Sequence, residues 1–137
     1  LLAGLWHETN TQGAGIMYRV IDTPRLFEVL RGHRFGGHDF GGQTTTLGIT
    51  LSDSFLPENA GRYVLRVENG RAALRDGGAA DVEIGLDVSS FSSLIVGAVD
   101  FARLYGYGLA TISDPAAVPL VERLFRAAQR PWCMTHF

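Results

Sequence analysis

The sequence has one cysteine and no lysine, and both shortages limit what the protein can be. Cys133 has no second cysteine for an internal disulfide, which favours a reducing compartment, so we expect a cytoplasmic protein. The 12 basic residues other than histidine are all arginine, they are balanced by 14 acidic residues, and the net charge is −2. A chain with this balance has no broad cationic surface, so we expect neither a nucleic-acid partner nor an anionic membrane partner.

Long hydrophobic runs are also missing from the sequence. No apolar stretch approaches the roughly 18 to 20 residues of a membrane-spanning helix, and no charged-then-apolar signal peptide opens the chain. The first residue is Leu1 rather than methionine, so we interpret the sequence as an excerpt from a longer polypeptide. Its 137 residues, 46% hydrophobic and 19% charged, predict one folded domain and argue against disorder. We assign residues 1–14 to a leading segment that continues an upstream region, and residues 15–137 to the domain.

Several segments have the β-branched or alternating apolar residues that are typical of strands. They are residues 16–22, 44–52, 62–67, 71–75 and 81–88, with 108–113 as a further short candidate. Asn69-Gly70 indicates a tight hairpin, since both central positions of that turn need a positive φ angle. The glycine-rich stretch "DGGAA" that follows indicates a second turn, so three of these strands are expected to form a meander with one polar face.

Helix signals lie between and after the strands. Residues 23–24 (Thr-Pro) supply an N-cap and a proline at the first helical position, and Ser89 or Ser90 can cap the apolar segment that follows. Residues 114–115 (Asp-Pro) open a last amphipathic helix, whose first turn Pro119 is expected to bend or restart. The sum predicts an α+β fold, an antiparallel sheet of about five strands with helices packed on one face.

Three glycine-containing stretches could be offered as phosphate loops, but such a loop needs a strand before it and a helix N-terminus after it. "GGHDFGG" (36–42) precedes a strand, so we interpret it as a flexible connector. "RDGGAA" (75–80) and "RLYGYG" (103–108) match the pyrophosphate pattern of acetyl-CoA enzymes. We interpret the first as a hairpin turn, and no convincing helix begins after the second. A small, complete acetyltransferase that uses residues 103–108 would bind acetyl-CoA on its own.

The histidines and the cysteine do not form a metal-binding pattern. His7, His33, His38 and His136 lack zinc-type spacing and only one cysteine accompanies them, so no metal site is expected. A nucleophilic role for Cys133 would need a histidine partner and a lowered pKa. His136 is only three residues away, but both lie in a tail, so we interpret Cys133 as a buried spectator.

The chain closes on "RPWCMTHF" (130–137), which is rich in large apolar side chains. Free ends are usually built from small or polar residues, because they fray into solvent. Two interpretations follow for this tail. It packs as a terminal strand on the sheet, or it is inserted into a pocket, in which case the last group placed there is a carboxylate.

The strand, turn and helix pattern over residues 61–115 resembles the sterol-carrier-protein-2 type domain. It opens with "GRYVLRVENGRAALRDGGAADVEIGLDV" and continues with a serine-rich helix segment. The stretches "GIMYRVID", "LPENAGRY" and the ending "PWC…F" point to one particular group of proteins that contain this domain. Together they are similar to the C-terminal domain of Eis-like (enhanced intracellular survival) GCN5-related N-acetyltransferases, from about residue 13 to the end.

This resemblance implies a role for the tail. Members have two GCN5-type folds before this domain; the first binds acetyl-CoA, and the chain-terminal carboxylate lies in the active site. Carried over, the general base is the α-carboxylate of Phe137, while His136 and Trp132 line the acceptor pocket. Relatives can carry an acid at the position of His136, so this departure bears on substrate preference. The resemblance further implies an aminoglycoside-like or lysine-like amine substrate, acetyl-CoA bound by the upstream domains of the same polypeptide, a homo-oligomer, and no metal.

Elementary chemistry is compatible with that role. A free α-carboxyl group has a pKa of about 3.3 to 3.7 and is a poor base in water, but burial among apolar side chains raises this value. The alternative hypothesis is a free-standing sterol-carrier-like module that holds a lipid or fatty acyl chain between sheet and helices. Fold analogy alone does not decide between the two.

Overall fold

The computed structural model describes residues 19–31 and 40–126, and the structural statements below concern these ranges. The boundary expected between residues 14 and 15 lies outside them. In chain order the elements are α2 (Thr23–Arg31), η1 (Phe40–Gly42), β1 (Thr45–Ser52), η2 (Pro57–Asn59), β2 (Gly61–Glu68), β3 (Arg71–Arg75), β4 (Val82–Asp87), α3 (Val88–Ile95), α4 (Phe101–Gly106), β5 (Ala110–Ile112), η3 (Pro115–Ala117) and α5 (Val118–Phe125).

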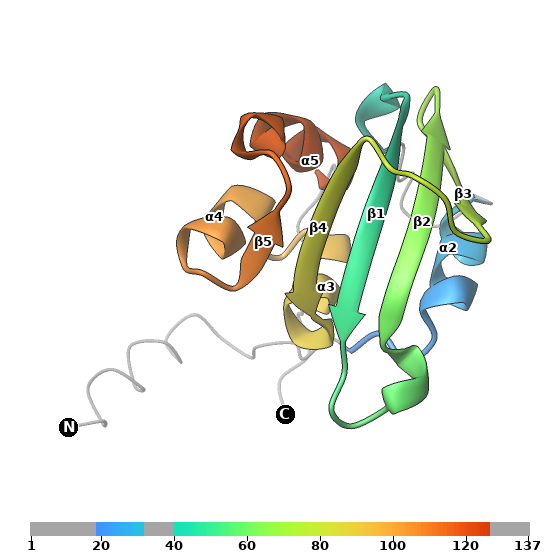
Figure 1. Cartoon of the computed structure of the whole chain (residues 1–137), viewed down its shortest axis with the longest axis vertical. Coiled ribbons are helices and arrows are strands. Elements are labelled where there is room, and N and C mark those ends of the chain that lie inside the picture. Colours follow the sequence, from blue (N-terminus) through green and yellow to red (C-terminus); the bar gives the residue numbers. More distant parts are fainter. Residues whose placement is uncertain (1–18, 32–39, 127–137) are drawn as a thin grey trace, which may run out of the picture.

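The strands form one five-stranded sheet in the order β3-β2-β1-β4-β5. Three neighbouring pairs are antiparallel, and β1 with β4 is the parallel pair. Figure 1 shows α2 and α3 behind the sheet, with α4 and α5 beyond β4 and β5. The predicted α+β fold is therefore confirmed, with one parallel pair in an otherwise antiparallel sheet.

The predicted meander is wrong at its second turn. The hairpin at Asn69-Gly70 is confirmed, with φ angles of 49° and 78°. After β3, however, residues 76–81 cross in front of β2 and β1 to reach β4 (Figure 1). There Thr46 donates its backbone N–H to the Asp81 carboxylate (2.9 Å), and β4 pairs with β1. "RDGGAA" therefore belongs to a crossover and not to a hairpin turn, because strand alternation fixes a face but not a neighbour.

The predicted strand at residues 16–22 is also wrong in its described part, since residues 19–22 form no strand. The backbone groups of Val20 bond to side chains instead. Its N–H donates to Oγ of Ser92 (2.8 Å), and its carbonyl accepts from Nδ2 of Asn59 (3.0 Å). Since these side chains satisfy both backbone groups, the segment needs no strand partner.

Two helix caps differ from the prediction, and in both cases an aspartate one or more residues earlier takes the role. The carboxylate of Asp22 accepts from N–H of Arg25 at the start of α2, while the Thr23 hydroxyl donates to Asn59. The carboxylate of Asp87 accepts from N–H of Ser90 at the start of α3. Aspartate is as good an N-cap as serine and better than threonine.

The last helical region follows the prediction. Asp114 accepts a hydrogen bond from N–H of Ala116 and caps η3. A new helix, α5, then begins at Val118, with Pro119 in its first turn. The proline restarts the helix there because it donates no backbone hydrogen bond.

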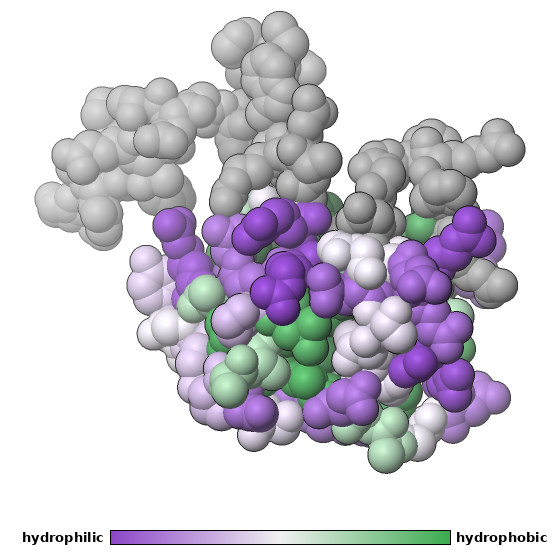
Figure 2. Space-filling model, turned by 90° about the horizontal axis from the view of Figure 1, so that it is seen from above, coloured by the Kyte–Doolittle hydropathy of each residue, from purple (hydrophilic) through white to green (hydrophobic). Residues whose placement is uncertain are grey.

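Phenylalanine rings fill the layer between sheet and helices. The Phe91 ring of α3 lies 6.1 Å from that of Phe27 in α2 and 6.5 Å from that of Phe125 in α5. These three rings and Phe101 are each at most 2% exposed. Seen from above, the hydrophobic residues that stay visible gather near the middle of the molecule, with polar residues around them (Figure 2). The contacts of the Phe91 ring with Phe27 and Phe125 join α2, α3 and α5 into one layer.

The end of the loop at residues 36–42, expected to be a flexible connector, is packed in its described part. Phe40 is buried, and Gly41 lies against the backbone of α5. A Cβ atom on Gly41 would overlap the carbonyl oxygen of Arg123. The tight fit explains why glycine stands at this position.

Gly41→Ala is expected to destabilise the fold by about 2 kcal/mol or more, because a positive φ angle and a steric overlap act together. Gly42→Ala is the matched control: Gly42 has the same φ of 65° but open space around it, so a loss of about 1 kcal/mol is expected. Urea unfolding followed by circular dichroism measures both. Equal losses in the two variants would contradict the overlap.

Candidate functional site

The predicted site residues all fall in the tail. Phe137, His136 and Trp132 lie outside the described residues, as do Cys133 and the other histidines, so their roles stay predictions. Within residues 19–31 and 40–126, no three metal-ligating side chains come together. In the same ranges no helix combines the length and the apolar character that crossing a membrane requires. The described residues end at Arg126, just before the tail.

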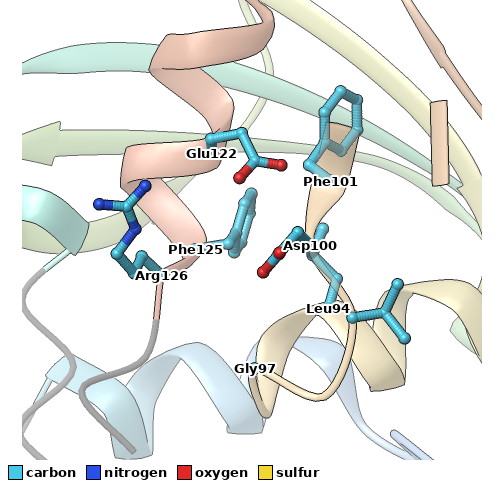
Figure 3. A pocket seen from close by; sticks show the side chains of 8 residues that line it. Leu94, Gly97, Asp100, Phe101, Glu122, Phe125 and Arg126 are labelled. Carbon is cyan, nitrogen blue, oxygen red and sulfur yellow. The ribbon is translucent and has the colours of Figure 1, made fainter. Parts of the chain in front are cut away.

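Arg126, the last described residue before the tail (residues 127–137 from here on), lines a cavity of about 250 Å³ between α5, α4 and the end of α3. Figure 3 shows Phe125 and Arg126 on one side of this cavity, Asp100 and Phe101 on another, and Gly97 below. Glu122 points toward it from α5, and its carboxylate accepts a hydrogen bond from N–H of Ala102 in α4. That carboxylate therefore joins α5 to the first turn of α4.

The pyrophosphate-like stretch at residues 103–108 has the wrong geometry for a phosphate loop. Arg103 lies within α4, and Gly108, with φ of 74°, lies just after its end. Strand β5 follows, so the loop adjoins a helix C-terminus, toward which carbonyl oxygens rather than N–H groups point. This arrangement is unfavourable for a pyrophosphate.

A buried polar cluster holds the chain just before α2. NH2 of Arg19 donates to both oxygens of Asp53 at 2.7 Å, and its guanidinium lies 5.5 Å from the centre of the Phe55 ring. The Asp53 carboxylate also accepts from the backbone N–H groups of Phe55 (3.0 Å) and Leu56 (2.9 Å) and from Nδ2 of Asn59 (3.3 Å). The cluster thus ties residues 19–22 to the connection between β1 and β2.

These contacts set the ionisation of Asp53. The Arg19 guanidinium holds the pKa of the Asp53 carboxyl well below its usual value, with hydrogen bonds acting in the same direction and burial opposing them. Because this pKa is lower in the folded than in the unfolded chain, the carboxylate stabilises the fold at neutral pH. The contribution is lost progressively as pH falls below about 4.

Asp53→Asn is therefore expected to lower Tm at neutral pH and to flatten the dependence of Tm on pH between about 5 and 2. Thermal unfolding in a pH series measures this, and the two curves should converge at the acid end. Asp76→Asn, an exposed change in the crossover, is the control and should leave the shape of the curve as it is. Parallel curves for Asp53→Asn and the unmodified chain would contradict the assignment.

An apolar groove runs between α2 and α3. It has a volume of about 640 Å³ and is lined by residues 19–22, by α2 and by α3. Its apolar walls include Leu26 and Val29 from α2, Ile95 at the end of α3, and Val96, which is the C-cap of α3. At its edge Ile21 is 69% exposed and Val29 is 46% exposed. Large apolar side chains left in this position indicate a binding surface.

A second polar cluster lies on the outer face of the sheet. Nε of Arg62 donates to Glu83 (3.0 Å) and its NH2 group to the carbonyl of Gly78 in the crossover (2.9 Å), and Glu83 raises the pKa of Arg62. The Glu83 carboxylate lies above Gly48, where a Cβ atom would overlap it. This cluster fastens the crossover to the sheet.

Sequence reasoning missed the groove and both polar clusters. Arg19 and Asp53 are 34 residues apart, and Arg62 and Glu83 are 21 apart, so no local pattern could pair them. The local signal available was the apolar character of Ile21 and Val29.

A sequence model of the sterol carrier protein domain family matches residues 29–134. Among solved structures, Eis1 from Mycobacterium abscessus is 26% identical, with a TM-score of 0.56 over 69% of this chain and 23% of that one. A GCN5-related N-acetyltransferase from Anabaena variabilis is 25% identical, with a TM-score of 0.57 over 70% of this chain and 24% of that one.

Sterol carrier proteins share the fold at lower identity. Sterol carrier protein domain 2 of Helicoverpa armigera is 15% identical, with a TM-score of 0.52 over 80% of this chain and 86% of that one. No curated protein sequence matches the chain. The chain thus spans about a quarter of the length of the acetyltransferases and most of the length of the carrier domain.

Proposed function

The chain belongs to the sterol carrier protein domain family, and from this premise we propose that it is the C-terminal domain of an acetyl-CoA-dependent N-acetyltransferase. The observation that carries the proposal is the sequence identity of 25 to 26% with Eis1 and with the Anabaena acetyltransferase. The carrier proteins, which share the fold, reach only 14 to 15%. The similarity to acetyltransferases therefore includes the amino-acid sequence as well as the backbone fold.

In this proposal the tail supplies the base. The α-carboxylate of Phe137 accepts a proton from the substrate ammonium, directly or through one water. The neutral amine then attacks the acetyl carbonyl carbon, the C–S bond breaks, and coenzyme A leaves with a proton returned to its sulfur. His136 lines the acceptor pocket, and the upstream region binds acetyl-CoA.

The described residues support this division of work. The tail starts from a fixed point, because Phe125 at the end of α5 packs edge-on against the buried Phe91. The layer in which a carrier would hold its lipid is filled by aromatic rings that are at most 2% exposed. A rigid platform for a functional tail fits these facts better than a lipid cavity between sheet and helices.

Acetyl transfer by the full-length protein tests the proposal. The protein is incubated with acetyl-CoA and either an aminoglycoside or a lysine-containing peptide, and mass spectrometry follows the gain of one acetyl group by the amine. We expect acetylation with at least one of the two amine classes, and no activity from the present chain alone. Absence of acetylation across both classes would contradict the proposal.

A second candidate function is binding of a fatty acyl chain or sterol, and the groove between α2 and α3 favours it. Its walls are apolar and its volume of about 640 Å³ suits a small lipid. Native mass spectrometry of the purified protein distinguishes the two candidates. A stoichiometric lipid would support the carrier role, whereas a lipid-free protein that transfers acetyl groups would support the enzyme.

A further inference from the structure

The apolar groove between α2 and α3 is left open by the described residues around it. Ile21 and Val29 expose most or nearly half of their surface, although Ile95 and Val96 beside them lie on the same apolar wall. The charged groups nearby already have partners, since Arg19 bonds to Asp53 and Arg25 to Glu28. What the groove offers is therefore apolar contact, and its occupant should be apolar.

The chain leaves α5 close to this groove. Arg126, the last described residue, lines the same cavity as Gly97, and Gly97 directly follows Val96 of the groove wall. The start of the tail is thus separated from the groove by the end of one helix, which is about 10 Å across. Residues 127–137 can span roughly 36 to 40 Å when extended, so they reach the groove with length to spare.

The composition of the tail matches the groove. Trp132 and Met134 are large and apolar, and Arg130 is the one charged side chain in residues 127–137 if His136 is neutral. We propose that the tail binds in the α2–α3 groove, with Trp132 packed against Ile21 and Val29 instead of in the acceptor pocket that the family resemblance implies for it. With residues 130–134 held there, the last three residues leave roughly 10 Å of chain to extend toward a neighbouring domain.

This inference goes beyond the proposed function and does not depend on it. It assigns the route of the tail and a partner for the groove, and it can be tested without acetyl transfer. A tail that binds the groove in an inactive protein would refute the proposed function alone. An active enzyme with an unprotected tail would refute the inference alone.

Cys133 provides the test, since it is the single thiol of the chain and lies within the segment. Its alkylation by iodoacetamide is measured in the folded chain, in Ile21→Asp and in Val29→Asp; both changes are at exposed positions, and circular dichroism verifies folding. We expect slow alkylation in the unmodified chain and a rate at least about tenfold higher in both variants. Leu109→Asp, at a 50% exposed leucine next to β5, is the matched control and should alkylate as slowly as the unmodified chain.

The fluorescence of Trp132 provides an independent test. In a Trp6→Phe background it is the only tryptophan, so its emission should shift to longer wavelength when Val29→Asp is added.

Alkylation of the native chain as fast as in urea would overturn the inference. Slow alkylation that stays equally slow in the groove variants would also overturn it, and so would a rate of alkylation that depends on protein concentration. A co-purified lipid in native mass spectrometry, found together with fast alkylation, would overturn it as well.

Discussion

Full-length protein with one glycine added after Phe137 is expected to show kcat lowered by about 10² to 10⁴, the usual contribution of a general base. The added residue moves the carboxylate by about 3.5 Å and places a neutral amide where the charge is needed. The proposal assigns acetyl-CoA binding to the upstream region, so KM for acetyl-CoA should change little. Steady-state kinetics with a saturating amine measure both parameters.

The matched control is Phe137→Leu, which keeps chain length and the terminal carboxylate while changing the side chain. We expect this variant to retain kcat within about tenfold, because an apolar side chain of similar size still shields the carboxylate. If the added glycine and Phe137→Leu reduce kcat equally, the ring and not the charge is responsible. Unchanged turnover in the extended protein would remove the carboxylate from the mechanism.

Phe91→Ala is expected to lower the free energy of unfolding by about 3 to 5 kcal/mol. Phe91 is fully buried, and its ring contacts one ring from α2 and one from α5, so its removal leaves a cavity between three helices. A natural domain is stable by only about 5 to 15 kcal/mol, so the variant should lose a large share of its stability. Urea titration followed by circular dichroism gives the difference.

Phe55→Ala is the chemically matched control for that experiment. Phe55 is 79% exposed, and its defined contact is the Arg19 guanidinium above the ring, so a loss of about 1 kcal/mol or less is expected. Similar losses at the two positions would contradict the central place of Phe91 in the core.

The sequence alone was sufficient where a structural choice is local. Alternation in "TLGITL" and "VEIGLD" identified the buried face of β1 and β4, and Asn69-Gly70 identified the hairpin, because side-chain period and turn geometry depend on adjacent residues. The restart of α5 near Pro119 was predictable for the same reason.

Choices that depend on distant residues were not predictable. The parallel pairing of β4 with β1 requires residues 76–81 to cross two strands, and nothing in their sequence distinguishes a crossover from a turn. Residues 19–22 have strand-like side chains, yet Ser92 and Asn59 satisfy the backbone of Val20. The same limit applies to the candidate site. The tail could be recognised from its composition and family likeness, whereas the groove forms only when α2 and α3 pack together.

The central claim is that the negative charge at the end of the chain removes the proton from the amine, and replacing that carboxylate by an amide tests it most directly. Cys133 permits this replacement, because a peptide covering residues 133–137 can be ligated to the preceding chain at its N-terminal cysteine. Full-length protein carrying the amidated peptide should show kcat lower by about 10² or more than protein ligated to the same peptide with a free carboxylate. Equal kcat values for the two ligated proteins would contradict the account.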